Sequence, residues 1–87
     1  MTTLRSLKNV GPTTIGWMES VGIQTVEDLE ALGAAAAYVR MKAAYPHKVS
    51  LNALWGLQGA LTGIRWNELP DTMKADLLAQ VEELERA

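Results

Sequence analysis

The stretch LKNVGPTTIGWMESVGIQTVEDL, residues 7–29, decides the fold of this chain. Gly11 and Pro12 interrupt it near its start, because glycine adopts backbone conformations that other residues avoid and proline is pre-set for the first turn of a helix. Gly22 ends the helix that Pro12 begins, since glycine is preferred just beyond a helix C-terminus. The stretch therefore predicts a first helix over residues 12–21.

A second helix is predicted directly after this turn. Thr25 can accept a hydrogen bond from the helix N-terminus, and Asp28, three residues on, can accept one in return, which is a variant of the capping box. This pattern predicts a helix over residues 25–32 that Gly33 ends. Two short helices that meet across tight turns are typical of the helix-hairpin-helix element, here with Val10-Gly11-Pro12 as its hairpin.

The hairpin leads to a hypothesis about DNA. A turn that feeds a helix N-terminus presents unpaired backbone N–H groups and the positive end of the helix dipole, and both favour phosphate. The N–H groups would be those of Thr13 and Thr14, with Lys8 adding positive charge. The candidate DNA-binding residues come from the turn and from the basic residues of the chain: Lys8, Asn9, Gly11, Thr13, Thr14, Lys42 and Lys48.

The same turn has a plainer interpretation, in which it only joins two packed helices. Hairpins that grip DNA usually read glycine–hydrophobic–glycine, with a lysine two residues later and a small residue four residues later. This chain has Asn9, Thr13 and Ile15 at the positions of the first glycine, the lysine and the small residue. The sequence thus favours the scaffold of the element more strongly than its contact with DNA.

Length and composition indicate one domain, residues 1–87, with a small core. A hydrophobic content of 48% with an ordinary share of charge predicts a globular chain. The sequence has no cysteine, and no apolar run approaches the roughly 20 residues that a membrane span needs. Because the N-terminus also lacks a signal-peptide pattern, we expect a cytoplasmic protein that does not associate with membranes.

The net charge of −2 argues against strong non-specific binding to nucleic acid. The charges are unevenly placed, because residues 31–67 carry four bases and no acid, whereas residues 68–87 carry six acids and two bases. One interpretation is a basic face beside an acidic helix. The other is a pair of solvated faces that attract each other.

Three further helices are predicted, over residues 34–45, over residues 51–64 and from Pro70 onward. The helix over residues 51–64 is apolar nearly all round, which predicts that it is the central and most buried one. It also has a face of small residues. Each glycine in a helix costs about 1 kcal/mol relative to alanine, so this face predicts a close approach by another element. We expect that element to be the hairpin helix of the same chain or a second subunit. The small residues are Gly56, Gly59, Ala60 and Gly63.

The sequence offers little for catalysis or metal binding. His47 is the only histidine and falls in a predicted loop, and there is no cysteine. The acids lie at helix surfaces, and a core this small leaves little room for a substrate cavity. We therefore predict no enzyme: no catalytic residue, no metal, no cofactor and no small-molecule substrate.

Two tryptophans suggest a different kind of site. Trp17 lies beside the apolar face of the first helix, and Trp66 lies in the last connection, where we expect it at the edge of the core. If they reach the surface, they would serve as contacts for another protein. The partner would be a regulatory protein or a second copy of this chain.

The order of the motifs resembles that of a known family. Nearly the whole chain, residues 4–84, resembles the C-terminal domain of TfoX-type proteins, which are bacterial regulators associated with natural DNA uptake. The resemblance implies an all-α, compact bundle of about five short helices with a helix-hairpin-helix-like element, and it supplies no catalytic residues. It rests on LKNVGP (7–12), VGIQTVEDL (21–29), LGA (32–34), SLN (50–52), LQGAL (57–61) and WNELP (66–70).

A shorter run, residues 22–29, also resembles the C-terminal domain of the RNA polymerase α subunit, which contacts promoter DNA and activators.

Taken with the hairpin, these resemblances lead to the main hypothesis, a non-catalytic binding module linked to competence or transcription. Its hairpin, Val10-Gly11-Pro12, would make at most weak contact with double-stranded DNA. The alternative is a protein–protein interaction domain that dimerises or docks on a regulatory partner without touching DNA.

Overall fold

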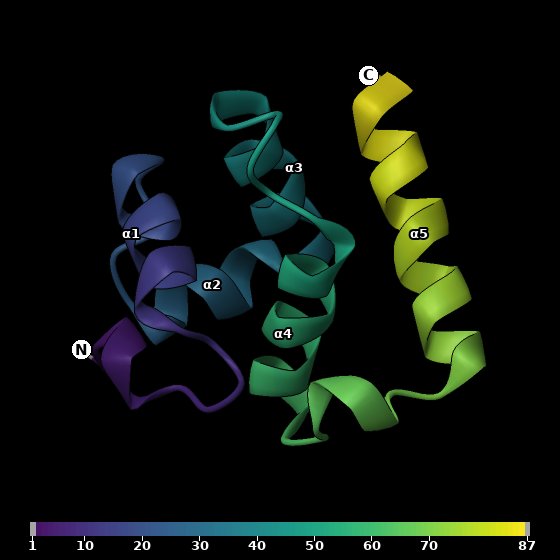
Figure 1. Ribbon diagram of the computed structural model, residues 1–87, viewed down its shortest axis with the longest axis horizontal. Coiled ribbons are helices and arrows are strands. Elements are labelled where there is room, and N and C mark those ends of the chain that lie inside the picture. The colour runs from purple at the N-terminus through teal and green to yellow at the C-terminus, as the bar shows by residue number, and fades with distance from the viewer. Residues whose placement is uncertain (1, 87) are drawn as a thin grey trace.

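Five α-helices and two short 3₁₀ helices form the computed structural model of the chain, which describes residues 2–86 (Figure 1). Within those residues, β-type pairing is limited to one bridge between Thr3 and Thr25. The all-α prediction is confirmed, and the helix-hairpin-helix element stays a prediction. The elements are η1 (Leu4–Ser6), α1 (Pro12–Ser20), α2 (Val26–Leu32), α3 (Ala34–Ala44), α4 (Leu51–Thr62), η2 (Trp66–Glu68) and α5 (Asp71–Arg86).

The turns around α2 form as the sequence predicts. Gly22 follows the C-cap of α1 with φ of 90°, a left-handed conformation that glycine adopts at no steric cost. At the start of α2, the Asp28 N–H donates to the Thr25 hydroxyl over 3.1 Å, and the Thr25 N–H donates to the Asp28 carboxylate over 3.2 Å. The capping box is therefore confirmed, and it fixes where α2 begins.

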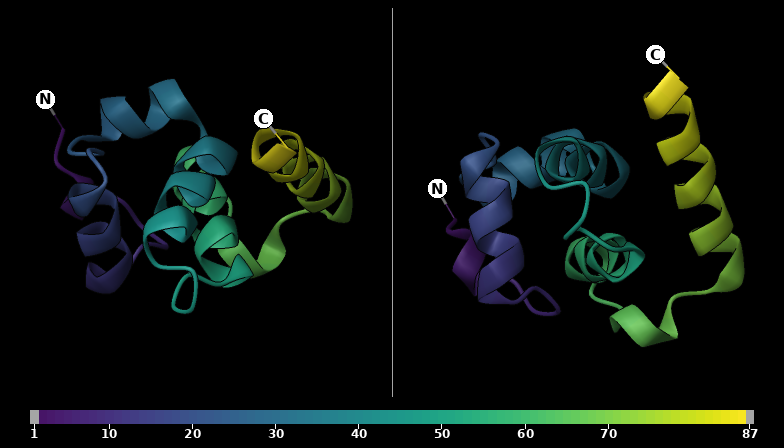
Figure 2. Two further views of the ribbon diagram at one scale, coloured as in Figure 1. Left: turned by 90° about the horizontal axis from the view of Figure 1, so that it is seen from above. Right: turned by 45° about the horizontal axis from the view of Figure 1, so that its top comes forward.

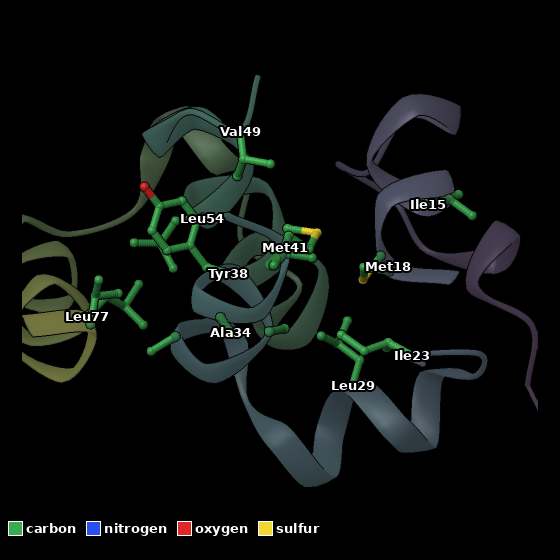
Figure 3. Packing of buried hydrophobic residues seen from close by; sticks show 14 of the residues in the cluster. Ile15, Met18, Ile23, Leu29, Ala34, Tyr38, Met41, Val49, Leu54 and Leu77 are labelled. Atoms are coloured by element: carbon green, nitrogen blue, oxygen red, sulfur yellow. The ribbon is translucent and has the colours of Figure 1, made fainter. Parts of the chain in front are cut away.

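The centre of the bundle is α3, not α4 as the apolar pattern predicts. Helix α3 contacts α1, α2, α4 and α5. Figure 3 shows Tyr38 and Met41 of α3 between Leu77 of α5 on one side and Met18 of α1 on the other. Because alanine has no side chain beyond Cβ, an alanine-rich helix lets neighbours approach from several directions. Its buried residues are Ala34, Ala35, Ala37, Tyr38 and Met41.

Helix α4 buries one face and leaves part of another in solvent. Leu54 and Leu57 are fully buried, whereas Leu51 at its start is 45% exposed. The helix ends at Thr62, two residues earlier than predicted, because Gly63 takes the left-handed conformation with φ of 77°. Ser50 is the N-cap residue, but its side chain makes no capping hydrogen bond.

Helix α5 lies on the opposite side of α3 and α4 from α1, as the three views agree (Figures 1 and 2). It docks on α3 through Leu77 and Val81, its two buried residues. The ammonium group of Lys74 also lies over the ring of Trp55 of α4, 5.4 Å from its centre. No helix within residues 2–86 is both long and apolar enough to cross a membrane.

Candidate functional site

The loop between η1 and α1, residues 7–11, owes its shape to one asparagine. Asn9 has φ of 69° and is the sole residue other than glycine with a positive φ in the described part of the chain. Asparagine tolerates the left-handed region better than most residues, because its short polar side chain bonds locally. Asn9 stands where DNA-gripping hairpins usually have a glycine, and both residue types tolerate a left-handed backbone.

The loop packs closely against α4 because Gly56 and Gly59 have no side chains. A Cβ placed on Gly56 would lie 2.7 Å from the carbonyl oxygen of Asn9, and one on Gly59 would lie 3.3 Å from the Asn9 side-chain nitrogen. A Cβ on Gly59 would also meet the carbonyl oxygen of Ile64 at 2.7 Å. The close approach predicted for the small-residue face is thus made by the hairpin loop and by the chain that follows α4. It is not made by the hairpin helix.

The N-terminus of α1 opens from this loop. Gly11 is the N-cap and Pro12 the first helical residue, so neither supplies a side chain that caps the helix. Within residues 2–86, the backbone N–H groups of Thr13 and Thr14 have no protein acceptor. Thr13 is exposed and Thr14 is half-buried. The turn therefore presents two free donors at the positive end of the α1 dipole.

Beside this N-terminus lies a hollow of about 220 Å³ between α1 and α4. It combines polar groups of the loop and of both helices with the ring of Trp17. Sequence reasoning identified Asn9, Thr14 and Trp17 but missed the contribution of α4, for which the small residue Gly56 was the available signal. The lining residues are Asn9, Val10, Thr14, Trp17, Ser50, Asn52, Ala53 and Gly56.

The three candidate lysines do not form one patch. Lys8 is exposed and directly precedes Asn9, and Lys48 is exposed two residues before Ser50 of the hollow. Lys42 instead donates to the Tyr38 hydroxyl over 3.2 Å. Figure 3 places Tyr38 toward Leu77 of α5, across the core from α1. Of the three lysines, Lys8 therefore belongs to the hairpin loop, Lys48 precedes the hollow, and Lys42 lies away from both.

The two tryptophans differ in their surroundings. Trp17 is half-buried, and its ring centre lies 6.1 Å from that of Tyr45, whose hydroxyl is hydrogen-bonded to Ser20 over 2.9 Å. Trp66 is 44% exposed, so it is more accessible than we expected for a side chain at the edge of the core. Within the described residues, no group of three or more His, Cys, Asp or Glu side chains could hold a metal ion.

Comparison with known proteins addresses the identity of this fold. Residues 1–81 match the family described as TfoX C-terminal domain. The chain belongs to that family. The resemblance of the motifs to the C-terminal domain of TfoX-type proteins is therefore confirmed.

A solved structure resembles this TfoX C-terminal domain over nearly its whole length. It is described as the crystal structure of an uncharacterized protein from Listeria monocytogenes, in a triclinic form. The two chains are 30% identical with a TM-score of 0.83, and the match covers 97% of this chain and 94% of the other. A search of curated proteins found no match.

Proposed function

We propose that this TfoX C-terminal domain is a non-catalytic binding module of a bacterial regulator of competence or transcription. The hairpin and the N-terminus of α1 make weak contact with the phosphate backbone of double-stranded DNA in the cytoplasm. The observation that carries the proposal is the pair of free N–H groups of Thr13 and Thr14, beside the exposed Lys8.

Three features support a phosphate contact at this place. Free N–H groups at a helix N-terminus are suited to anions. The loop is already fixed against Gly56, so little ordering is needed on binding. The acids of α5 lie on the far side of the bundle from α1 (Figure 1), which reduces their repulsion of a phosphate at the hairpin.

The strength of the contact is limited by charge. The chain has a net charge of −2, and of the three candidate lysines only Lys8 belongs to the hairpin loop itself, while Lys48 lies two residues before Ser50 of the hollow. Each phosphate neutralised by a lysine contributes about one unit to the slope of log affinity against log salt. We therefore expect a shallow slope of about 1–2 and no sequence preference.

Fluorescence anisotropy of a labelled duplex, titrated at about 50 mM and about 200 mM salt, tests the proposal. Lys8→Ala should weaken binding to every duplex sequence alike and reduce the salt slope by about one. Lys74→Ala is the matched control, because it removes the same charge from α5, across the bundle. Equal slopes for the two variants, or no binding at either salt concentration, would contradict a hairpin contact.

A second candidate function is self-association through Trp66. The observation that favours it is the exposed fraction of this side chain, 44%, since tryptophan is enriched at the energetic centres of protein interfaces. Sedimentation equilibrium of the protein should then show a dimer that Trp66→Ala dissociates. A wild-type protein that stays monomeric at the highest concentration tested would exclude a second copy as the partner.

A further inference from the structure

The side of the molecule that faces away from the hairpin contains a groove of about 440 Å³ between α3 and the second half of α5. Leu32 and Ala36 form part of one wall, and Ala79 and Leu84 form part of the other. The alanines leave the middle of the groove wide, and Leu84 is 42% exposed along it. The groove therefore has an apolar floor that could accommodate bulky apolar side chains of another molecule.

Two of the three helices that line this groove, α2 and α5, carry an excess of acids. The third, α3, carries Arg40 and Lys42 and no acid, but these two residues donate to the Val21 carbonyl oxygen and the Tyr38 hydroxyl and do not line the groove. Helix α2, which ends at Leu32 in the groove wall, carries three acids and no base. In α5, Glu83 lines the groove directly. Arg86 offsets this charge only in part, because its guanidinium lies 2.6 Å from the Glu82 carboxylate and 3.9 Å from that of Glu83, and one base stands against the glutamates at 82, 83 and 85. An apolar floor with an acidic rim is complementary to a helix that has an apolar edge flanked by lysine or arginine.

We propose that this groove is a docking site for a basic amphipathic helix of a partner protein. The apolar edge of that helix lies against Leu32, Ala36 and Leu84, and its cations pair with Glu83 and its neighbours on α5. The acidic rim disfavours DNA, because phosphate would be repelled there. It also disfavours a second copy docking through its own α5, because that arrangement would bring two sets of glutamates together.

This docking site goes beyond the proposed function at the hairpin and is separate from it in space. The groove belongs to α3 and α5, whereas the hairpin packs on α1 and α4. A protein partner on α5 and a DNA phosphate at α1 would approach from opposite sides of the bundle (Figure 2). One site can therefore fail its test without affecting the test of the other.

The probe is a fluorescein-labelled, amidated peptide of leucine and lysine, with leucine at helical spacing along one face. Its control is the same peptide with every lysine replaced by glutamate. Anisotropy titrations with the wild-type protein should give saturable binding of the lysine peptide and none of the glutamate peptide. Lys8→Ala should leave peptide binding unchanged, which separates this test from that of the hairpin.

Two matched pairs of variants locate the peptide on the surface. Leu84→Ser should weaken binding about tenfold, because it removes an apolar contact from the groove. Leu78→Ser should leave binding unchanged, since Leu78 is equally exposed (41%) on the same helix but does not line the groove. Glu83→Gln should weaken binding more than Glu85→Gln, because Glu83 lines the groove and Glu85 does not.

Both leucine variants alter exposed side chains, so each should keep the circular dichroism spectrum of the wild type. The proposal is overturned if the lysine peptide does not bind, or if the glutamate peptide binds equally well. It is also overturned if the two leucine variants have the same effect, since attraction to the acidic helix as a whole would then explain the binding.

Discussion

The N-terminal segment, residues 2–11, and helix α5 are attached to the bundle in opposite ways. The segment has only one short turn of 3₁₀ helix, yet it is tied to α2 by several polar bonds. The Val26 N–H donates to the Thr2 carbonyl over 2.9 Å, and the Thr2 N–H and hydroxyl both donate to the Glu27 carboxylate over 2.9 Å. The loop of this segment then packs on Gly56 so closely that a Cβ there would lie 2.7 Å from the Asn9 carbonyl oxygen.

Helix α5 is the longest regular element, but its attachment is apolar. Within residues 2–86, its side-chain hydrogen bonds, Gln80 to Asp76 and Arg86 to Glu82, stay inside the helix. It is held on α3 by Leu77 and Val81, and on α4 by the contact of Lys74 with the ring of Trp55. Regular secondary structure and firm attachment are therefore separate properties here, and the less regular segment has the more specific contacts.

The largest expected effect comes from weakening the apolar attachment of α5. Leu77→Ala should lower the free energy of unfolding by about 2–3 kcal/mol, because it deletes a buried side chain from the α3 contact. Leu84→Ala is the matched control, since it makes the same chemical change at a residue that is 42% exposed. Urea denaturation followed by circular dichroism measures both variants.

The two leucine variants test whether α5 is attached mainly by its buried apolar side chains. If α5 is held by its apolar contacts, Leu84→Ala should cost less than about 1 kcal/mol and Leu77→Ala several times more. Equal losses for the two variants would mean that the buried contact does not dominate. A loss near zero for Leu77→Ala would mean that α5 contributes nothing to the cooperative unit.

Local features of the fold could be predicted from the sequence, whereas contacts between distant elements could not. The helices and their turns follow from local signals, such as the capping box at Thr25 and the glycine at position 22. The central place of α3 does not follow, because alanine gives no apolar periodicity and its value lies in letting other helices approach. The contact of Asn9 with Gly56 joins residues far apart in the chain, so the glycines indicated a close approach but not its partner.

The candidate site was predictable to a similar degree. The turn before α1 and the free N–H groups of Thr13 and Thr14 follow from Gly11 and Pro12, whereas the helix-hairpin-helix element and its contact with DNA stay predictions. The position of Lys42 beside the Tyr38 hydroxyl does not, because helical spacing gives a side chain's direction on its own helix and not the element it faces. The groove along α5 is likewise a property of how two helices diverge, which no local pattern encodes.

A smaller effect is expected where the N-terminal loop meets α4. Gly56→Ala gains about 1 kcal/mol of helix propensity, but its Cβ would lie 2.7 Å from a backbone oxygen. Moving a fixed loop costs more than that gain, since overpacking typically costs 1–3 kcal/mol, so we expect a net loss of about 1 kcal/mol. Gly16→Ala in α1 is the control, because nothing lies within 4 Å of its Cβ and it should gain stability.

The informative result is whether the urea midpoints of Gly56→Ala and Gly16→Ala shift in opposite directions from that of the wild type. Urea denaturation should place the midpoint of Gly56→Ala below that of the wild type and the midpoint of Gly16→Ala above it. If both variants were stabilised alike, the loop would yield to a methyl group at little cost. The N-terminal segment would then be no more specifically attached than α5.

The smallest effect concerns the polar tie at Glu27. The Thr2 N–H, donating to this carboxylate, is the main cause that lowers the pKa of Glu27 below its ordinary value. A carboxylate with a lowered pKa in the folded state adds stability above its unfolded pKa of about 4.3, and that contribution is lost as the pH falls through the folded value. Because Glu27 is fully exposed, solvent screening keeps the effect small.

Glu27→Gln should therefore lower the thermal midpoint slightly at pH 7, and the gap to the wild type should close as the pH falls below about 4. Glu30→Gln is the control on the same helix, since Glu30 makes no side-chain hydrogen bond within residues 2–86. Melting curves from pH 7 to pH 3 test the pair. A gap that is the same at every pH would mean that the negative charge of Glu27 does not contribute to the tie between Thr2 and α2.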